Sequence, residues 1–214
     1  MRKWNYLSLA FMLAALVLSA PANAGGPYGD VALGVGAYGN SKNDAADLQS
    51  QLSQEGILSN VTVEDGTIGA TLGLGYRFDR YVALEVDYVD LGTATATVDV
   101  YSPSVATFKQ DNQATGETLD LIGFIPLTQR ISLFGKVGAF SYTLKETLHS
   151  SIPLLVGNLS YSATTTEFGS GVEIDFTPRL GLRSGISVYS EVGDKDTTGR
   201  TNIGFAYAQL VVSF

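Results

Sequence analysis

The chain has no cysteine among its 214 residues, and few of those residues carry charge. Without disulfides, its stability must come from the packing of the chain itself. Charged residues make up 16% of the sequence, below the roughly 25% of typical soluble domains. Only 13 residues are basic against 21 acidic ones, which argues against a nucleic-acid partner because such proteins need a basic patch. No Cys/His spacing indicates a zinc site, and we expect neither a metal nor a cofactor.

Long hydrophobic runs are also missing, except at the N-terminus. The basic start Met1-Arg2-Lys3 precedes an apolar run, Leu7–Ala20, and a small-x-small cleavage site, Ala22-Asn23-Ala24. This order predicts a secretory signal peptide over residues 1–24. The alternative, a retained membrane anchor, needs ~20 apolar residues. After residue 24 no run is long enough for a transmembrane helix, so any membrane span in the mature domain, 25–214, must consist of strands.

What the sequence does have is an alternation with a period of two, which is typical of strands. Leu, Ile, Val and Phe fall on one face of each segment, and Gly, Ser, Thr and a few charges fall on the other. Their connections alternate between long and short, as in outer-membrane barrels with short periplasmic turns and longer outer loops. We expect an all-β fold, an eight-stranded antiparallel transmembrane β-barrel wound as an up-and-down meander. The expected strands cover 30–38, 66–77, 81–98, 114–125, a fifth from 131, a sixth ending at 176, a seventh from 180 and an eighth from 200.

The longer connections are polar. The first, residues 39–65, contains a segment, Asn43–Glu55, that predicts a short helix capped by Asn43 and ended by Gly56. We expect the rest of this connection, and residues 101–113 and 147–159, to be loops. Two of the loops are acidic, and three interpretations stay open for them: they could hold divalent cations, contact a host, or simply be a solvated exterior. The acidic residues are Asp44, Asp47, Glu55, Glu64 and Asp65 in the first loop, and Asp194 and Asp196 in the fourth, residues 193–199.

The last fifteen residues, 200–214, read as one strand rich in β-branched and aromatic residues. A terminal apolar strand in a soluble protein invites pairing with other chains, whereas a strand that closes a barrel in lipid has no free edge. The pattern places Tyr207, Gln209 and Ser213 on the inner face, and Val211 fits that face poorly. The expected lipid-facing row is Ala206, Ala208, Leu210, Val212 and Phe214.

Aromatic residues gather beside the short turns, where they would form a girdle at the membrane interface. Strands are rich in aromatics in any case, but clustering at one end of the strands favours a girdle. The residues expected at this periplasmic interface are Tyr76, Phe78, Tyr81, Phe124, Phe176 and Phe214. A second group toward the loop ends would form the outer girdle: Tyr38, Tyr88, Tyr142 and Tyr161.

With these residues in view, the chain resembles the small eight-stranded outer-membrane barrels, the OmpA-like transmembrane domain and its porin-like relatives. The resemblance spans essentially the whole mature chain, and it implies a place in the outer membrane of a Gram-negative cell. The sequence stops at the barrel, so we expect no wall-anchoring role of the kind that an added peptidoglycan-binding domain provides. The segments that carry the resemblance are Leu74-Gly-Tyr-Arg-Phe78, 82–92, Gly123-Phe-Ile-Pro-Leu127, 133–138, 169–173 and Phe214.

Charged residues recur on the non-lipid faces of the strands, at a similar height above the short turns. The interior of an eight-stranded barrel is just wide enough for side chains to fill, and charges buried there would pair because leaving them unpaired is costly. The resemblance implies the same salt-bridge network for Glu85, Lys136, Glu173 and Arg183. The network would be a structural plug or, alternatively, a gate in a narrow ion path. The full set of candidate lumen residues is Glu85, Asp87, Asp120, Lys136, Glu173 and Arg183.

Two motifs point to other functions but lack the context that those functions need. Gly34–Gly39 matches a dinucleotide fingerprint, yet no βαβ pattern follows it. His149 precedes Ser150 and Ser151, and a Ser–His pair near the membrane rim suggests an enzyme acting on lipid acyl groups. Nucleophilic catalysis also needs an orienting partner and an oxyanion site, and no motif for either is visible. We therefore expect no enzyme activity.

Together these patterns predict an outer-membrane protein with a structural or surface-interaction role and a lumen plugged by salt bridges. The alternative is a narrow porin-like channel for ions or small solutes. A soluble ligand carrier would place large apolar residues inside and Lys and Glu outside, which is the reverse of the pattern here. The expected partners are outer-membrane lipid and lipopolysaccharide, the barrel-assembly machinery through the C-terminal strand, and a host or surface ligand at the loops.

Overall fold

The structure is a computed structural model, and it describes residues 25–39, 41–64, 66–102, 105–151, 157–193 and 200–214. The expected signal peptide, 1–24, lies outside these residues. One helix, α2 (Ser41–Gln54), follows the first strand in the described part of the chain. The strands are β1 (Gly26–Tyr38), β2 (Leu58–Glu64), β3 (Gly66–Arg77), β4 (Val82–Ser102), β5 (Ala106–Pro126), β6 (Ile131–Ser150), β7 (Gly157–Thr177), β8 (Leu180–Val192) and β9 (Thr201–Ser213).

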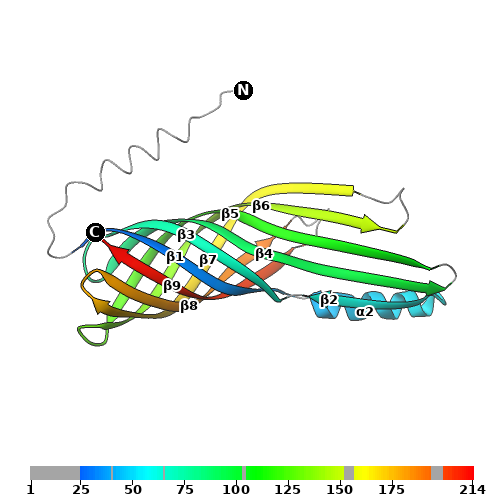
Figure 1. The fold of residues 1–214 in the computed structure, drawn as a ribbon, viewed down its shortest axis with the longest axis horizontal. Coiled ribbons are helices and arrows are strands. Elements are labelled where there is room, and N and C mark those ends of the chain that lie inside the picture. Colours follow the sequence, from blue (N-terminus) through cyan, green and yellow to red (C-terminus); the bar gives the residue numbers. More distant parts are fainter. Residues whose placement is uncertain (1–24, 40, 65, 103–104, 152–156, 194–199) are drawn as a thin grey trace, which may run out of the picture.

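Eight of these strands close into a barrel (Figure 1). Hydrogen-bonded neighbours run in the order β4-β3-β1-β9-β8-β7-β6-β5, and β4 also pairs with β5 to complete the ring. Every pairing around the ring is antiparallel. Apart from the closure between β1 and β9, each pairing joins two barrel strands that are consecutive along the chain. The predicted eight-stranded up-and-down barrel is therefore confirmed.

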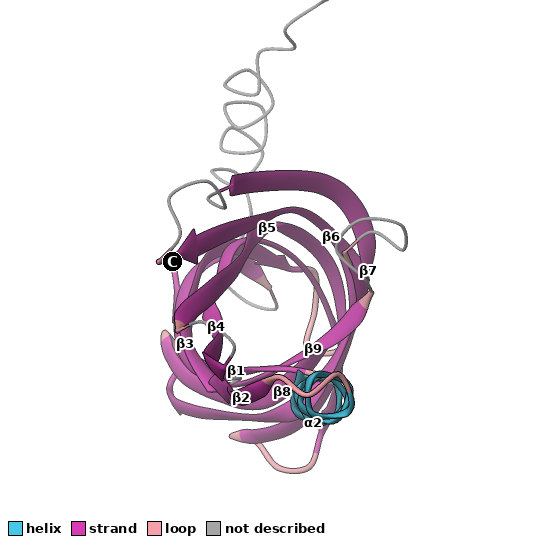
Figure 2. Ribbon diagram, turned by 90° about the vertical axis from the view of Figure 1, so that its right-hand side faces the viewer, coloured by secondary structure: helices cyan, strands magenta, loops and turns pink. Residues whose placement is uncertain are grey.

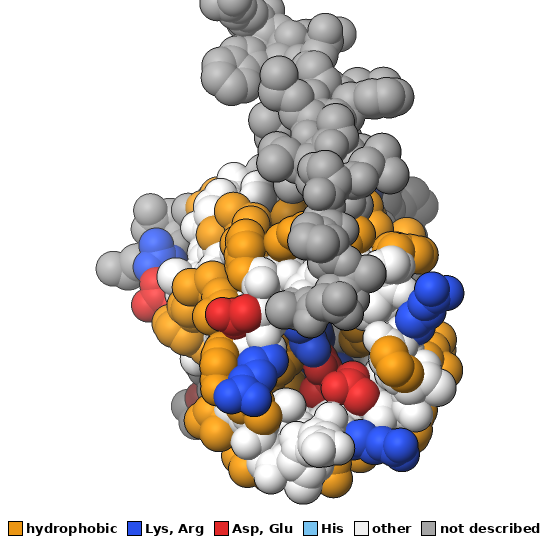
Figure 3. Space-filling model, turned by 90° about the vertical axis from the view of Figure 1, so that its left-hand side faces the viewer, with side chains coloured by type: hydrophobic (Ala, Val, Ile, Leu, Met, Phe, Trp, Pro, Cys, Tyr) orange, Lys and Arg blue, Asp and Glu red, His pale blue; other side chains and the backbone are white. Residues whose placement is uncertain are grey.

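Side chains alternate between the inside and the outside of the barrel wall. Leu33, Ile68 and Leu74 point outward and are 66%, 83% and 69% exposed, whereas Ile122 and Phe140 are fully buried inside. Apolar surface left in water costs about 25 cal/mol per Å², so an outer face of this kind is matched to lipid. Figure 3 views the short-turn end, where hydrophobic side chains lie around the rim, acidic side chains are seen near the middle, and basic side chains lie both near the middle and at the edge.

The pairing of β9 with β1 closes the ring and places the C-terminal strand as expected. Tyr28 lies opposite Ser213 at one end of this ladder. Leu210 and Val212 face outward, while Gln209 lies inside. Val211, which fits the inner row poorly by its polarity, is nevertheless buried in the lumen. Closure of the ring removes the free edge that a terminal strand would otherwise present.

The strands β4, β5, β6 and β7 continue well past the barrel, as Figure 1 shows at its right-hand side. The prediction that residues 101–113 and 147–159 form loops is therefore wrong in large part. β4 and β5 stay paired as far as Val100 opposite Ala106, and β5 and β6 as far as Phe108 opposite Ser150. The reason is that polarity identifies a strand only where one face is buried. On β5 and β6 beyond the barrel neither face is continuously apolar, and hydrogen bonding to the neighbouring strand maintains the extended conformation.

The connection between β1 and β3 contains the predicted helix and also an unpredicted strand. Helix α2 begins two residues earlier and ends one residue earlier than expected. β2 then pairs with the outer part of β4, from Glu64 opposite Thr95 onward. Gln49 holds helix and strand together, because its Nε2 donates to Ser59 O at 2.6 Å and its Oε1 accepts from Val61 N at 2.8 Å. Within the described residues, no helix has both the length and the apolar character needed to cross a membrane.

The aromatic residues divide between the two faces of the barrel wall. At the short-turn end Phe78, Tyr81, Phe176 and Phe214 lie outside, with exposed fractions of 45% to 77%. Tyr76 lies half-buried against Phe78, with their ring centroids 5.3 Å apart.

Phe124 was wrongly placed at this interface, because its side chain lies inside the lumen and is only 4% exposed. It is four residues from the inward-facing Asp120, and residues an even number apart on a strand share a face. The same rule puts Tyr38 and Tyr142 inside, whereas Tyr88 is on the outer face.

Candidate functional site: the charged lumen

Strand register brings the lumen charges to neighbouring positions on the inner wall. Glu173 on β7 lies opposite Arg183 on β8, and Arg183 lies opposite Gln209 on β9. On another part of the wall, Glu85 on β4 is the register partner of Asp120 on the adjacent strand β5. In an antiparallel sheet directly opposed side chains are about 5 Å apart. Long side chains at these positions therefore reach one another both along the wall and across the narrow lumen.

Arg183 is the centre of the first cluster, and its side chain is 1% exposed. Its Nη1 donates to Glu85 Oε2 at 2.8 Å and to Gln209 Oε1 at 3.0 Å, and its Nε donates to Glu173 Oε2 at 3.1 Å. The hydroxyl of Tyr28 donates to the same Glu85 oxygen at 2.7 Å. Arg183 thus connects β4, β7, β8 and β9 through charge-assisted hydrogen bonds, which are roughly twice as strong as neutral ones.

Arg77 extends this cluster toward the short-turn end. Its Nη2 lies 2.6 Å from Glu173 Oε1, and a quarter of its side chain is exposed. The ring of Phe124 is close to both guanidinium groups, with the Cζ of Arg77 at 4.2 Å and that of Arg183 at 5.6 Å from its centroid. A desolvated cation over an aromatic face is stabilised by about 2 kcal/mol. The inward position of Phe124 therefore serves the charge cluster.

Lys136 forms a second ion-pair cluster. Its Nζ lies 2.5 Å from Glu167 Oε1 and 3.3 Å from Asp120 Oδ2, and its side chain is 7% exposed. The ring of Tyr207 lies 5.7 Å from the same ammonium group. Both carboxylates are fully buried. A buried ion pair stays charged only when each partner is well placed, so Lys136 and its two carboxylates act as one unit.

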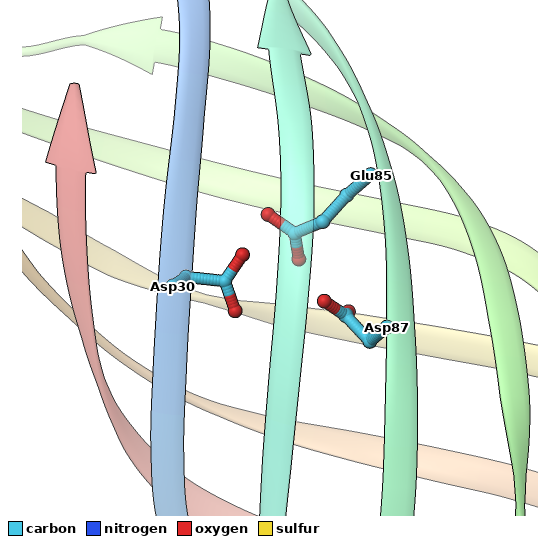
Figure 4. A group of neighbouring side chains, drawn as sticks. All are labelled: Asp30, Glu85 and Asp87. Atoms are coloured by element: carbon cyan, nitrogen blue, oxygen red, sulfur yellow. The ribbon is translucent and has the colours of Figure 1, made fainter. Parts of the chain in front are cut away.

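A third group consists of carboxylates alone. Asp30 on β1 and Glu85 and Asp87 on β4 point toward one another (Figure 4), with one oxygen of each within 4.8 Å of the others. Gln209 Nε2 donates to Asp30 Oδ1 at 2.6 Å and lies 3.5 Å from Glu85 Oε1. Glu85 belongs to both this carboxylate group and the Arg183 cluster.

The lumen is packed rather than open. Beside the Lys136 cluster it contains a cavity of about 10 Å³, lined among others by Asp87, Ser187 and Tyr207. That volume corresponds to about one water molecule. Glycines make room for the large inner side chains. A Cβ on Gly75, for example, would run into the ring of Tyr28. Large side chains therefore fill the described lumen around these charge clusters.

All six candidate lumen residues face the interior of the barrel. Ion pairs join Glu85 and Glu173 to Arg183, and Asp120 to Lys136. Asp87 departs from the expectation, because it faces two other carboxylates and no ion pair joins it to a basic side chain of the described residues. Four further contributors were not among the candidate lumen residues, although the pattern had placed Gln209 on the inner face. Each lies on the inner face by the same two-residue period: Asp30, Arg77, Glu167 and Gln209.

At the opposite end, the strands that leave the barrel enclose a groove of about 310 Å³. Its wall includes Tyr38 at the barrel mouth, Leu48 of α2, Val63 of β2, Phe108 of β5 and Leu148 of β6. Figure 2 looks along the barrel from this end, with α2 beside the opening. Of the acidic residues expected in the loops, Glu64 is exposed on β2. Asp194 and Asp196 lie outside the described residues.

An antiparallel barrel in which consecutive strands pair, with an apolar exterior suited to lipid and ion pairs inside, defines the class of small outer-membrane β-barrel proteins. Comparison with known families agrees. The profile of the OmpA-like transmembrane domain matches residues 29–214, and the chain belongs to this family. It is an outer-membrane protein of that type. No curated protein matches the sequence.

The solved structures that are similar to this chain include the following three. Neisserial surface protein A (NspA) has 15% sequence identity and a TM-score of 0.49, covering 90% of this chain and 100% of its own. The N-terminal β-barrel domain of Pseudomonas aeruginosa OprF has 13% identity and a TM-score of 0.46, covering 88% and 97%. Ail, the attachment invasion locus protein of Yersinia pestis, has 12% identity and a TM-score of 0.41 in complex with the heparin analogue sucrose octasulfate, covering 86% and 98%.

Proposed function

We propose that this protein is a structural or surface-interaction barrel of the outer membrane whose lumen is closed by its salt-bridge network. The observation that supports this most directly is the position of Arg183. Its buried guanidinium group reaches from β8 to Glu85 on β4 and to Glu173 on β7, so it spans the interior. An ion crossing the barrel would have to displace it from both carboxylates.

The energy of these contacts keeps the lumen closed. Breaking a buried ion pair by removing one partner typically costs about 3–5 kcal/mol. Lys136 adds a second obstacle, with its own two carboxylates. An arrangement that must break two such clusters in succession conducts rarely. The alternative function, a narrow porin-like channel for ions or small solutes, is favoured only by the surplus of carboxylates in the lumen, which would attract cations.

Conductance of the refolded mature protein in a planar bilayer tests the proposal. We expect a silent membrane from the parent protein, with folding confirmed by its faster migration on an unheated gel. Arg183→Ala, which removes the spanning side chain, is expected to admit ions. Arg200→Ala is the matched control, because Arg200 pairs with Glu191 on the exposed side. Discrete steps from the parent that change in Lys136→Ala would establish the channel instead.

The surface role rests on the part of the chain beyond the barrel. There β2, α2 and the ends of β4 to β7 build a sheet and a groove outside the membrane span, which a plain membrane anchor does not need. We propose that this extension contacts lipopolysaccharide or a host ligand, and that β9 is the segment the assembly machinery recognises. Deletion of 41–64 should abolish ligand binding by whole cells and leave barrel assembly intact. Loss of the folded barrel in that variant would assign the segment to folding.

We further propose that the protein has no enzyme activity. His149 Nε2 lies 3.8 Å from Asp111 Oδ2 on the exposed outer strands. Ser151 Oγ accepts from Thr107 N at 3.1 Å. These contacts join neighbouring strands, which is a structural role for both side chains. Lipid A acylation should therefore be the same in cells that carry His149→Ala as in parent cells, and a change would restore the enzyme hypothesis.

A further inference from the structure

The lumen contains more negative than positive charge. Its basic side chains among the described residues are Arg77, Lys136 and Arg183. Burying a carboxylate without a compensating charge is costly, so the surplus is neutralised either by protons or by a bound cation. The surplus lies at Asp30 and Asp87, to which no ion pair assigns a basic partner. The buried acidic side chains are Asp30, Glu85, Asp87, Asp120, Glu167 and Glu173.

The unsatisfied oxygens of Asp30 and Asp87 converge on one place. Asp30 Oδ2 and Asp87 Oδ1 are both buried and accept no hydrogen bond, and the two side chains are 4% and 3% exposed. Both oxygens lie over Gly73 of β3, because a Cβ on that glycine would meet Asp30 Oδ2 at 2.8 Å and Asp87 Oδ1 closer still. Figure 4 shows the carboxylates of Asp30, Glu85 and Asp87 turned toward the space between them.

Neutral oxygen ligands are available beside these carboxylates. Asp87 also lines the 10 Å³ cavity, together with Ser187 and Gln209. The hydroxyl of Ser187 is buried and has no hydrogen-bond partner. The cavity has the volume of about one water molecule, so a water there could complete the coordination of an ion held by Asp87.

We propose that Asp30, Glu85 and Asp87 bind one divalent cation inside the barrel, with Ca²⁺ as the best match. All the donors are oxygens, which hard cations prefer. Oxygens that lie within 4.8 Å of one another can share one ion at Ca²⁺–oxygen distances of about 2.3–2.6 Å. Mg²⁺ usually keeps several waters in its coordination shell, whereas the cavity of about 10 Å³ beside Asp87 has room for about one.

Glu85 links this site to the plug, since its Oε2 accepts from Arg183 and Tyr28. The inference rests on the proposed function, because the cation is held in a closed lumen. A bound cation would hold Glu85 in place and offset the repulsion between the carboxylates that flank it.

The test measures calcium bound to the refolded mature protein. The parent and the variants Asp87→Asn and Glu64→Gln are refolded in zwitterionic detergent in the presence of Ca²⁺. The ion can then enter the site before the closed barrel shields it. After desalting, atomic emission should find about one calcium per parent chain. Calorimetric titration of protein refolded without Ca²⁺ should show at least tenfold weaker binding for Asp87→Asn than for the parent. Glu64→Gln removes an exposed carboxylate of β2 and should bind as the parent does.

A second measurement keeps the proposal testable if Asp87→Asn fails to fold. Tb³⁺ bound by the parent should luminesce when tyrosine is excited, because Tyr28 contacts Glu85, and Ca²⁺ should displace it. A parent that retains no calcium, or an Asp87→Asn variant that binds as tightly as the parent, would overturn the site. Absent calcium with a silent bilayer would remove the cation site alone, whereas a conducting parent would remove the plug whatever the calcium content.

Discussion

Replacing Arg183 by methionine should destabilise the barrel strongly, because it leaves two buried carboxylates without their shared cation. Glu85 and Glu173 are 1% and 2% exposed and lie 2.8 Å and 3.0 Å from the guanidinium nitrogens. Loss of one partner of a buried pair costs about 3–5 kcal/mol. Glu173 keeps Arg77 at 2.6 Å, and Glu85 keeps the hydroxyl of Tyr28. We therefore expect the lower end, about 3 kcal/mol.

The assay is urea unfolding in lipid vesicles, followed by the gel shift between folded and unfolded forms. Its control is Arg200→Met, which breaks a pair with Glu191 whose side chains are 51% and 69% exposed and should cost below about 1 kcal/mol. Adding Glu85→Gln to Arg183→Met should recover part of the lost stability, because it removes one of the stranded charges. A cost for Arg183→Met no larger than that of the control would refute the account of the lumen as a stabilising ion-pair network.

Three further results are expected. Leu72→Arg places a charge on the lipid face near the middle of β3, where Leu72 is 66% exposed, and unfolding in vesicles should show a loss of about 2–4 kcal/mol; no loss would put this face outside the bilayer. Phe124→Ala should cost about 3–5 kcal/mol because the ring is buried, and the same assay should give a clearly smaller loss for the outward Phe176→Ala. On the outer strands, the hydrogen bond from Thr95 holds the pKa of Asp111 below its usual value. This contact therefore stabilises the fold at pH values above the unfolded pKa of Asp111, and the stabilisation is lost as the pH falls through the lower, folded pKa. An NMR titration that follows Thr95 should show the contact breaking at that lower pH.

The barrel itself could be predicted because the two faces of each strand meet different surroundings. Lipid outside and packed side chains inside give each strand a strict two-residue alternation, which the sequence displays directly. The bounds of β3, Gly66–Arg77, were predicted to the residue for this reason. Beyond the barrel this signal weakens, and β2 and the outer ends of β4 to β7 read as polar loops, although the alternation on β4 was followed as far as residue 98.

The lumen site was predicted in part. Parity along each strand identifies inward residues, and applied consistently it would have added Asp30 and Glu167 and moved Phe124 inside. Parity cannot tell which inward residues meet. The contact of Arg183 with Glu85 joins residues 98 positions apart in the sequence, and it depends on the stagger between strands and on the width of the closed ring.

The sequence by itself determined the class of fold, the lipid-facing surface and the presence of charge in the lumen, because each depends on local alternation and composition. Only the tertiary structure decided how those charges are distributed. It placed Arg183 between two glutamates and Lys136 between Glu167 and Asp120, and it left Asp30 and Asp87 facing each other across Gly73 without a basic partner. Closing the ring sets the distance across the lumen, and that distance determines which charges are paired.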